Sequence, residues 1–253
     1  MSLYIYSYFY NYEEMKLRIH KLILLAASIA ICLATNTSDN FTFTRDSESV
    51  YRVSFVTDEI TLQDAGDYSK VISKSGGYTE IIGMPELPTY TSIIMTDPNA
   101  EYEIDFSVKS SRTLSGIKVF PNQSMVNGLE REEIHEIDNS FYDSPQLYPL
   151  KNVFLSEPMI MRGMNLSFLQ VIPFEYSPLN EELTIYESIE ITITKSKGGD
   201  NHQHIQMPRS RVFENIYSEK VINYEKSTRE EEYQTPAILY ICGGSSESSS
   251  SLQ

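Results

Sequence analysis

Apolar residues recur at every second position in several short runs between residues 40 and 183. The clearest runs are SVYRVSFV at 49–56 and EYEIDFSV at 101–108, in which polar residues stand between the apolar ones. Successive side chains of a β-strand point to opposite faces of the sheet, so this period predicts strands that are buried on one face only.

Similar runs predict further strands at 78–82, 89–95, 115–120, 165–173 and 182–194. The last run has a slip near Glu187 and Ser188, which we interpret as a β-bulge. Turn sequences such as DAGD and KSGG separate the runs, and no long apolar stripe at helical spacing appears before residue 210. We therefore expect residues 35–200 to form an all-β domain, either an antiparallel β-sandwich or a jelly-roll-like fold.

The sequence GMPELP at 83–88 places two prolines directly before an expected strand. Proline fixes its own φ and disfavours the helical region for the residue before it, so residues 84–87 are expected to be extended. Proline also has no N–H to donate, which suits a position at a sheet edge.

Residues 201–236 are expected to hold a short helix and a linker. The helix would lie in SRVFENIYSEKVINYEK, with Val212, Ile216, Tyr217 and Val221 on one face, and the polar stretch STREEEYQTP follows it.

Residues 237–253 differ in character from the alternating runs. AILYIC at 237–242 is continuously apolar and precedes two glycines and a serine tract, which is typical of the first strand of a parallel α/β domain. We expect this segment to be the start of an incomplete α/β domain. The alternative is a flexible serine-rich end after one edge strand.

Residues 1–34 are expected to be a signal-peptide region. Lys16, Arg18 and Lys21 precede an apolar run that ends in small residues, which predicts cleavage after Ala34 and translation from Met15. The protein would then be secreted and would contact the membrane only during export. Retention of the segment as a membrane anchor is the alternative.

The chain is acidic, with a formal net charge of −15. Because nucleic-acid binding relies on basic residues that neutralise phosphates, this balance argues against a nucleic-acid partner. Only Cys242 remains after removal of the signal region, so the secreted chain has no internal disulfide.

Several motifs in order resemble the N-terminal propeptide of gingipain-type cysteine peptidases. They are GMPELP before a strand, IKVFP at 117–121, VIPFEYSP at 171–178, LTIYESIEITI at 183–193, FENIYSEKVINY at 213–224, and AILYICGG, which is similar to the first strand of the catalytic domain.

The resemblance implies a propeptide that chaperones a cysteine peptidase through export, covers its active cleft and is released by proteolysis. The downstream peptidase domain is then the partner. The catalytic histidine and cysteine of the family would lie beyond this chain, so no catalytic residue, Cys242 included, is assigned here, and no cofactor is expected.

Such inhibition needs one protruding side chain to fill the peptidase's specificity pocket. Arg131 is our candidate, because it lies in GLEREEIHEI within a long irregular connection at 122–158, and Lys151 is the second choice. An exposed arginine paired with Glu130 or Glu132 is the alternative interpretation. Arg229, in the linker, is the candidate processing site.

Two other functions need weighing. His202 and His204 are metal-ligating residue types, but no third ligand is evident, and exposed linker histidines are the simpler interpretation. With 18 tyrosines, the chain is also compatible with a secreted binding or adhesion module that recognises glycans, although the lack of tryptophan argues against it.

Overall fold

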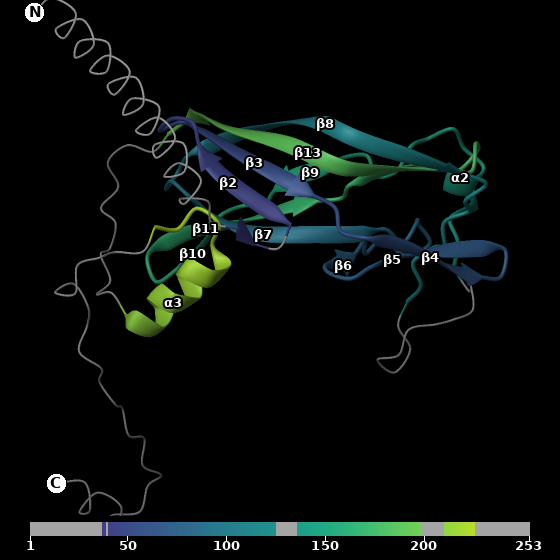
Figure 1. Cartoon of the computed structure of the whole chain (residues 1–253), viewed down its shortest axis with the longest axis horizontal. Helices are drawn as coiled ribbons and strands as arrows, with labels where there is room; N and C mark the ends of the chain where they lie inside the picture. Colours follow the sequence, from purple (N-terminus) through teal and green to yellow (C-terminus); the bar gives the residue numbers. More distant parts are fainter. Residues whose placement is uncertain (1–36, 39, 125–135, 199–209, 226–253) are drawn as a thin grey trace, which may run out of the picture.

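Two antiparallel β-sheets, stacked face to face, form the body of the protein (Figure 1). The computed structural model describes residues 37–38, 40–124, 136–198 and 210–225. This arrangement is the antiparallel β-sandwich that the alternating pattern predicts.

The first sheet is built around one long strand, β13, which pairs with β8 along one edge and with β3 and β12 along the other. Its strands are β1 (Thr37–Ser38), β2 (Phe41–Arg45), β3 (Val50–Val56), β8 (Glu101–Ser115), β12 (Phe174–Ser177) and β13 (Glu182–Lys197).

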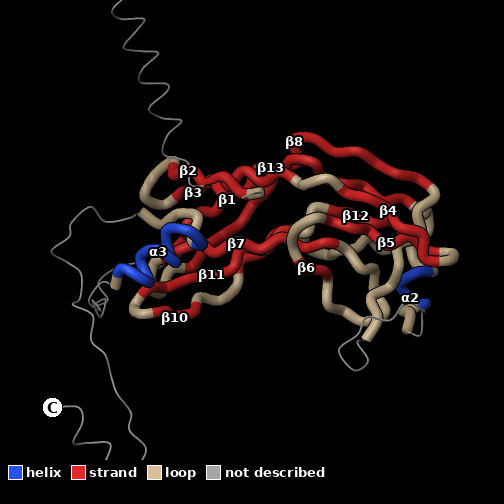
Figure 2. The backbone as a smooth tube through the Cα atoms, turned by 60° about the horizontal axis from the view of Figure 1, so that its bottom comes forward, coloured by secondary structure: helices blue, strands red, loops and turns tan. Residues whose placement is uncertain are grey.

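The second sheet has the order β10-β11-β7-β6, with β9 also paired to β11. Its strands are β6 (Gly77–Tyr78), β7 (Pro88–Thr96), β9 (Val153–Leu155), β10 (Met159–Met161) and β11 (Met164–Val171). A separate hairpin pairs β4 (Ile60–Ala65) with β5 (Tyr68–Ser73). Two helices, α2 (Asn139–Tyr142) and α3 (Arg211–Lys220), lie at opposite ends of the molecule (Figure 2).

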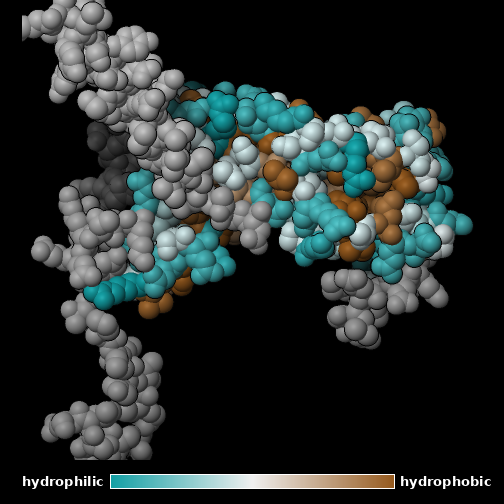
Figure 3. Space-filling model, viewed as in Figure 1, coloured by the Kyte–Doolittle hydropathy of each residue, from teal (hydrophilic) through white to brown (hydrophobic). Residues whose placement is uncertain are grey.

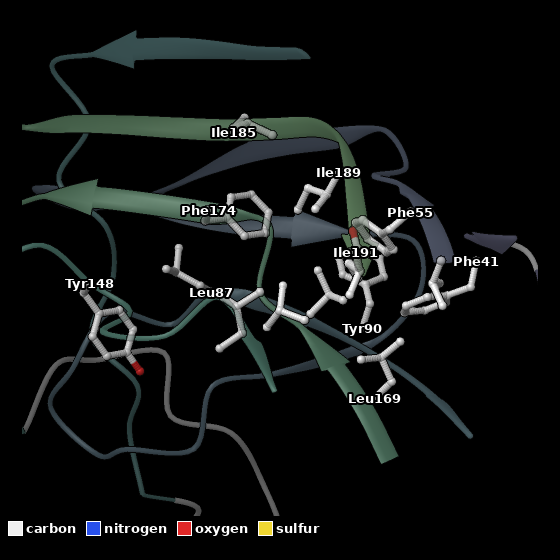
Figure 4. Close-up of a cluster of buried hydrophobic side chains, with 14 of the residues drawn as sticks. Phe41, Phe55, Leu87, Tyr90, Tyr148, Leu169, Phe174, Ile185, Ile189 and Ile191 are labelled. Carbon is white, nitrogen blue, oxygen red and sulfur yellow. The ribbon is translucent and has the colours of Figure 1, made fainter. Parts of the chain in front are cut away.

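The hydrophobic core lies between the two sheets (Figure 4). Phe55 and Ile191 enter it from the first sheet, and Tyr90 and Leu169 enter it from the second. The rings of Phe55 and Tyr90 meet edge to face with their centroids 5.0 Å apart, a favoured arrangement for an aromatic pair.

Several expected strands are confirmed. β3 buries Tyr51, Val53 and Phe55, the three apolar residues that alternate in its sequence. The register of β13 against β8 shifts on both sides of Ser188, where the bulge was expected. Residues 88–96 form β7, directly after the extended proline segment.

Two expected strands differ. The strand expected at 78–82 is only the end of β6, at Gly77–Tyr78. Residues 116–121 form no regular strand and contribute isolated bridges at Val119 and Pro121. The segment runs between β5 and the proline segment: it exchanges backbone hydrogen bonds with Ser69 on one side and with Met84 and Glu86 on the other, which is too few for a continuous ladder.

Helix α3 is confirmed, and its expected buried face is right at Tyr217 and Val221 but wrong at Val212 and Ile216. Glu214, Tyr217 and Val221 are buried, whereas Val212 and Ile216 are exposed. The helix is turned so that Phe213 and Tyr217 face the sheet, while Val212 and Ile216 face away from it. Among the described residues, no helix is of a length and hydrophobicity that would cross a membrane. The predicted signal region and residues 237–253 lie outside the described residues.

Candidate functional site

The two arms that flank residues 125–135 are tied together by Gln123 and Glu136. The Gln123 Nε2 donates to the Glu136 carbonyl at 2.7 Å, and the Glu136 N–H donates to Gln123 Oε1 at 3.0 Å. The Ser124 N–H also donates to Glu136 Oε2 at 3.1 Å. One side-chain amide thus satisfies both backbone groups of the opposite arm, as a neighbouring strand would.

Gly83 lies between the same two arms and bonds to both. Its N–H donates to the Asn122 carbonyl at 2.8 Å, and its carbonyl accepts from the Asp138 N–H at 3.0 Å. Gly83 has φ +80°, and an added Cβ would lie 3.0 Å from the Asp138 nitrogen. Only glycine adopts this conformation without strain while admitting so close a backbone.

The proline segment after Gly83 is held in place by Thr79. The Thr79 hydroxyl donates to the Pro85 carbonyl at 2.7 Å and accepts from the Leu87 N–H at 3.1 Å. The Asn122 side chain donates to the Thr79 carbonyl at 2.8 Å. The segment that the sequence predicts to be extended therefore forms one wall of the loop base. We call residues 83–86, 120–124 and 136–138 the loop base.

Two buried tyrosines bond to Val119, the residue just before the first arm of the loop base. The Tyr142 hydroxyl donates to the Val119 carbonyl at 2.8 Å, and the Val119 N–H donates to the Tyr176 hydroxyl at 3.3 Å. Burial raises the pKa of Tyr142 far above its ordinary value and that of Tyr176 to about 12. The raised pKa of Tyr142 keeps its hydroxyl a donor to the Val119 carbonyl well into the alkaline range.

Helix α2 begins directly after the second arm. The Asp138 carboxylate accepts from the Phe141 N–H at 3.1 Å and from the Ser140 hydroxyl at 2.5 Å, which lowers the pKa of Asp138. This is N-cap geometry, and it fixes the direction in which the arm enters the fold. Phe141 then packs against Tyr148, with ring centroids 5.8 Å apart.

Three of the four predicted site residues, Arg131, Arg229 and Ala34, lie outside the described residues. Lys151 is described and exposed, three positions after Tyr148, and it has no ion pair within the described part of the chain. The structure thus describes the base of the segment that carries Arg131, and it shows Tyr148, three positions before Lys151, in contact with Phe141 of α2.

At the other end of the molecule, a second amide holds the segment that precedes the linker. The Met95 N–H donates to Asn223 Oδ1, and Asn223 Nδ2 donates to the Met95 carbonyl, both at 2.7 Å. Ile222 donates from its N–H to the Ile93 carbonyl at 3.0 Å. Residues 221–224 are all buried and extend the edge of β7.

Sequence patterns did not single out Gln123, Glu136 or Asn223. Their roles depend on partners elsewhere in the fold: Asn223, for example, contacts a residue 128 positions earlier. The one available signal was Gly83, because a glycine before a proline segment is typical of a turn with positive φ.

The described residues contain no group of three or more histidine, cysteine or acidic side chains that would hold a metal ion. His202 and His204 lie outside them. Of the tyrosines in the described ranges, seven are buried, namely Tyr51, Tyr90, Tyr142, Tyr148, Tyr176, Tyr217 and Tyr224. Much of the tyrosine content that prompted the glycan-binding alternative therefore belongs to the hydrophobic interior.

Comparison with known families gives one match that covers most of the chain. The Propeptide_C25 family model matches residues 37–231. Gingipain R1 of Porphyromonas gingivalis is 22% identical over 204 residues, which is 77% of this chain and 20% of that protein. Gingipain R2 of the same species is 21% identical over 186 residues, 70% of this chain and 25% of that protein. The chain thus spans a quarter or less of these curated relatives.

Two solved structures share the fold. The complex of Porphyromonas gingivalis RgpB pro- and mature domains contains a chain that aligns with a TM-score of 0.61 and 19% identity, covering 75% of this chain and 100% of that one. A structure addressing the zymogenic latency of gingipain K aligns with a TM-score of 0.52 and 20% identity, covering 65% of this chain and 99% of that one.

Proposed function

The chain belongs to the Propeptide_C25 family, and on that premise we propose that it chaperones a secreted gingipain-type cysteine endopeptidase and keeps it inactive until proteolysis. Its partner is the peptidase domain of the same precursor. In this proposal the chain contributes no catalytic residue: the nucleophile and its histidine belong to the peptidase domain. The −15 net charge supports a protein partner over nucleic acid.

Latency requires a side chain that enters the specificity pocket without being cleaved. We assign this role to Arg131, within residues 125–135. The observation that carries the assignment is the loop base, where Gln123, Glu136 and Gly83 close both arms with direct hydrogen bonds. A base held in this way lowers the entropy lost on binding, which is the principle behind tight protein inhibitors.

Lys151 is the second candidate for the pocket. It is exposed and follows Tyr148, which packs against Phe141 of α2, by three positions, so its side chain is open to a partner. An inhibitor anchored by Lys151 would lose inhibition on Lys151→Ala and keep it on Arg131→Ala.

Release of the peptidase requires cleavage between the two domains. We propose Arg229 as the processing site, because it follows the buried segment 221–224 by a few residues in a polar stretch. N-terminal sequencing of the matured peptidase should then begin at Glu230. A start far from Glu230 would exclude Arg229.

Secretion is part of the proposal and rests on residues 15–34, with cleavage after Ala34. Mass spectrometry of the exported protein should find Thr35 at its N-terminus. An exported protein that retains residues 15–34 would support the membrane-anchor alternative.

The central experiment adds the purified chain to the separately produced peptidase domain of its precursor and follows hydrolysis of a peptide substrate. Activity should fall in proportion to added chain and reach its minimum near one equivalent. Binding without loss of activity would contradict the latency role, and the absence of binding would contradict the partnership.

A further inference from the structure

The outer face of the second sheet, on the side away from the core, is apolar over three strands. Leu169 and Val171 of β11 point into the core, so Leu166 and Phe168 point outward. The strand registers place Met95 and Met159 opposite Leu166, Ile93 opposite Phe168, and Met161 opposite Met164. A sheet face of this composition requires a cover.

Helix α3 covers only part of this face. Tyr217, Val221 and Tyr224 pack against Leu166, and the Tyr217 hydroxyl donates to the Met161 carbonyl at 3.3 Å. The Arg162 guanidinium lies over the Phe213 ring, 4.6 Å from its centroid. These contacts place the Phe213 flank of the helix beside the turn that joins β10 to β11.

Five apolar side chains, three on this sheet face and two on the helix, remain exposed. Their exposed fractions are 46% for Met159, 37% for Met161, 37% for Phe168, 66% for Val212 and 40% for Ile216. Val212 and Ile216 are one turn apart on α3, and their stripe borders its Phe213 flank. Figure 3 shows hydrophobic surface at the lower edge of the molecule beside α3. We call these five residues the α3 patch.

The chain leaves the described fold beside the α3 patch. Tyr224 packs in the same cluster as Tyr217 and is followed by Glu225, the last described residue. A chain spans at most about 3.5 Å per residue, so the apolar run that starts at Ala237 lies within roughly 40 Å of Glu225. Whatever domain the linker carries is therefore present at high local concentration around this patch.

We propose that the α3 patch is a second docking surface for the peptidase domain, separate from the loop base. The inference rests on the proposed function and adds the place where the partner binds. The loop base and α3 lie at opposite ends of the long axis (Figures 1 and 2). A peptidase that contacts both is held at two points, so the exposed methionines and the two aliphatic residues of α3 are covered only while the peptidase domain is bound.

The test combines footprinting and affinity. Dilute hydrogen peroxide should oxidise Met159 and Met161 in the chain alone, and mass spectrometry should find both protected by at least about fivefold in the one-to-one complex with the precursor's peptidase domain, since burial removes access to the sulfur. In a binding titration, the double variant Met159→Ser/Val212→Ser should raise the Kd by about tenfold or more, as truncation of interface anchors does.

The matched control is Val56→Ser. Val56 is exposed to 57% on the outer face of the first sheet, on the opposite side of the sandwich. It should leave the Kd within about twofold of the wild-type value, because scattered surface substitutions rarely matter. The melting temperatures of both variants should match that of the wild-type chain, which separates docking from folding.

Three outcomes would overturn the inference. Equal oxidation of Met159 and Met161 in the chain and in the complex would show that the peptidase leaves the patch open. A wild-type Kd for the double variant would do the same, while inhibition by the wild-type chain would leave the proposed function standing. Protection that depends on chain concentration without peptidase would identify a second copy as the occupant.

Discussion

Gln123 and Glu136 exchange two hydrogen bonds across the base of the segment between them, at 2.7 and 3.0 Å. The Gln123 side-chain amide bonds to a backbone N–H and carbonyl, as a paired strand does elsewhere in the fold. The Asn223 side-chain amide bonds to the N–H and carbonyl of Met95 in the same way at the opposite end. The two ends that the proposals assign to the peptidase are therefore both held by amide side chains to backbone groups.

Gln123→Leu should loosen the loop base. It leaves the Glu136 N–H and carbonyl without these partners, so the free energy of unfolding should fall by about 1–3 kcal/mol. The inhibition constant against the peptidase domain should rise, because the loop must then be ordered on binding. Urea denaturation and inhibition kinetics measure the two effects. A destabilised variant that inhibits as well as the wild type would show that the loop base has no role in inhibition.

Gly83→Ala tests the contact between Gly83 and the second arm. Gly66→Ala is its control, because Gly66 has φ +70° with open space around its Cβ position, whereas Gly83 has φ +80° and faces the Asp138 nitrogen at 3.0 Å. Both substitutions introduce left-handed backbone strain of about 1–2 kcal/mol. Only Gly83→Ala should add a further loss from crowding, as measured by chemical denaturation. Equal losses would mean that the second arm moves freely.

Asn223→Ala should release the segment before the linker. The partly buried Met95 N–H and carbonyl lose their side-chain partner, which should lower the free energy of unfolding by about 1–3 kcal/mol. Limited proteolysis should then cut within residues 221–225, which are buried in the wild-type chain up to Tyr224. Asn180→Ala, in an exposed turn, is the control and should leave the cleavage pattern unchanged.

Stability should decline in acid through Asp58. Partial burial acts to raise its pKa, but hydrogen bonds from Tyr90, Ser75 and Ser73 together outweigh burial and lower it. A lowered pKa means that the stabilisation is complete above about pH 3.9, the unfolded value, and is lost as pH falls through the lower folded value. The difference in unfolding free energy between wild type and Asp58→Asn should therefore shrink from pH 6 to pH 2. Tyr90→Phe should reduce this pH dependence in part. A difference between wild type and Asp58→Asn that stays constant from pH 6 to pH 2 would contradict the role of Asp58.

The sequence predicts the sandwich well where burial alone decides the pattern. β3 and β13 alternate because one face meets the core, and the slip at Ser188 is visible as a break in that alternation. Helix α3 was found, but Val212 and Ile216 were placed on the wrong face. The spacing of apolar residues does not show whether Val212 and Ile216 or Phe213 and Tyr217 face the sheet. In the structure the two large rings of Phe213 and Tyr217 pack over β11.

The loop base was less predictable for a different reason. Gly83 contacts Asn122 and Asp138, which come from two other parts of the chain, and no local pattern encodes which arm will meet it. The resemblance carried by GMPELP and the later motifs supplied what periodicity lacked, since it implied an inhibitory side chain, while the length of the connection at 122–158 pointed to where that side chain lies. Arg131 itself remains a prediction.

The most direct measurement is the inhibition constant of Arg131→Ala against the precursor's peptidase domain, beside those of Lys151→Ala and Arg112→Ala. The account predicts a rise of about a hundredfold or more for Arg131→Ala, as for the loss of a buried anchor, and values near wild type for the other two variants. An unchanged inhibition constant for Arg131→Ala would contradict the claim that Arg131 fills the specificity pocket of the peptidase. This holds with or without a large rise for Lys151→Ala.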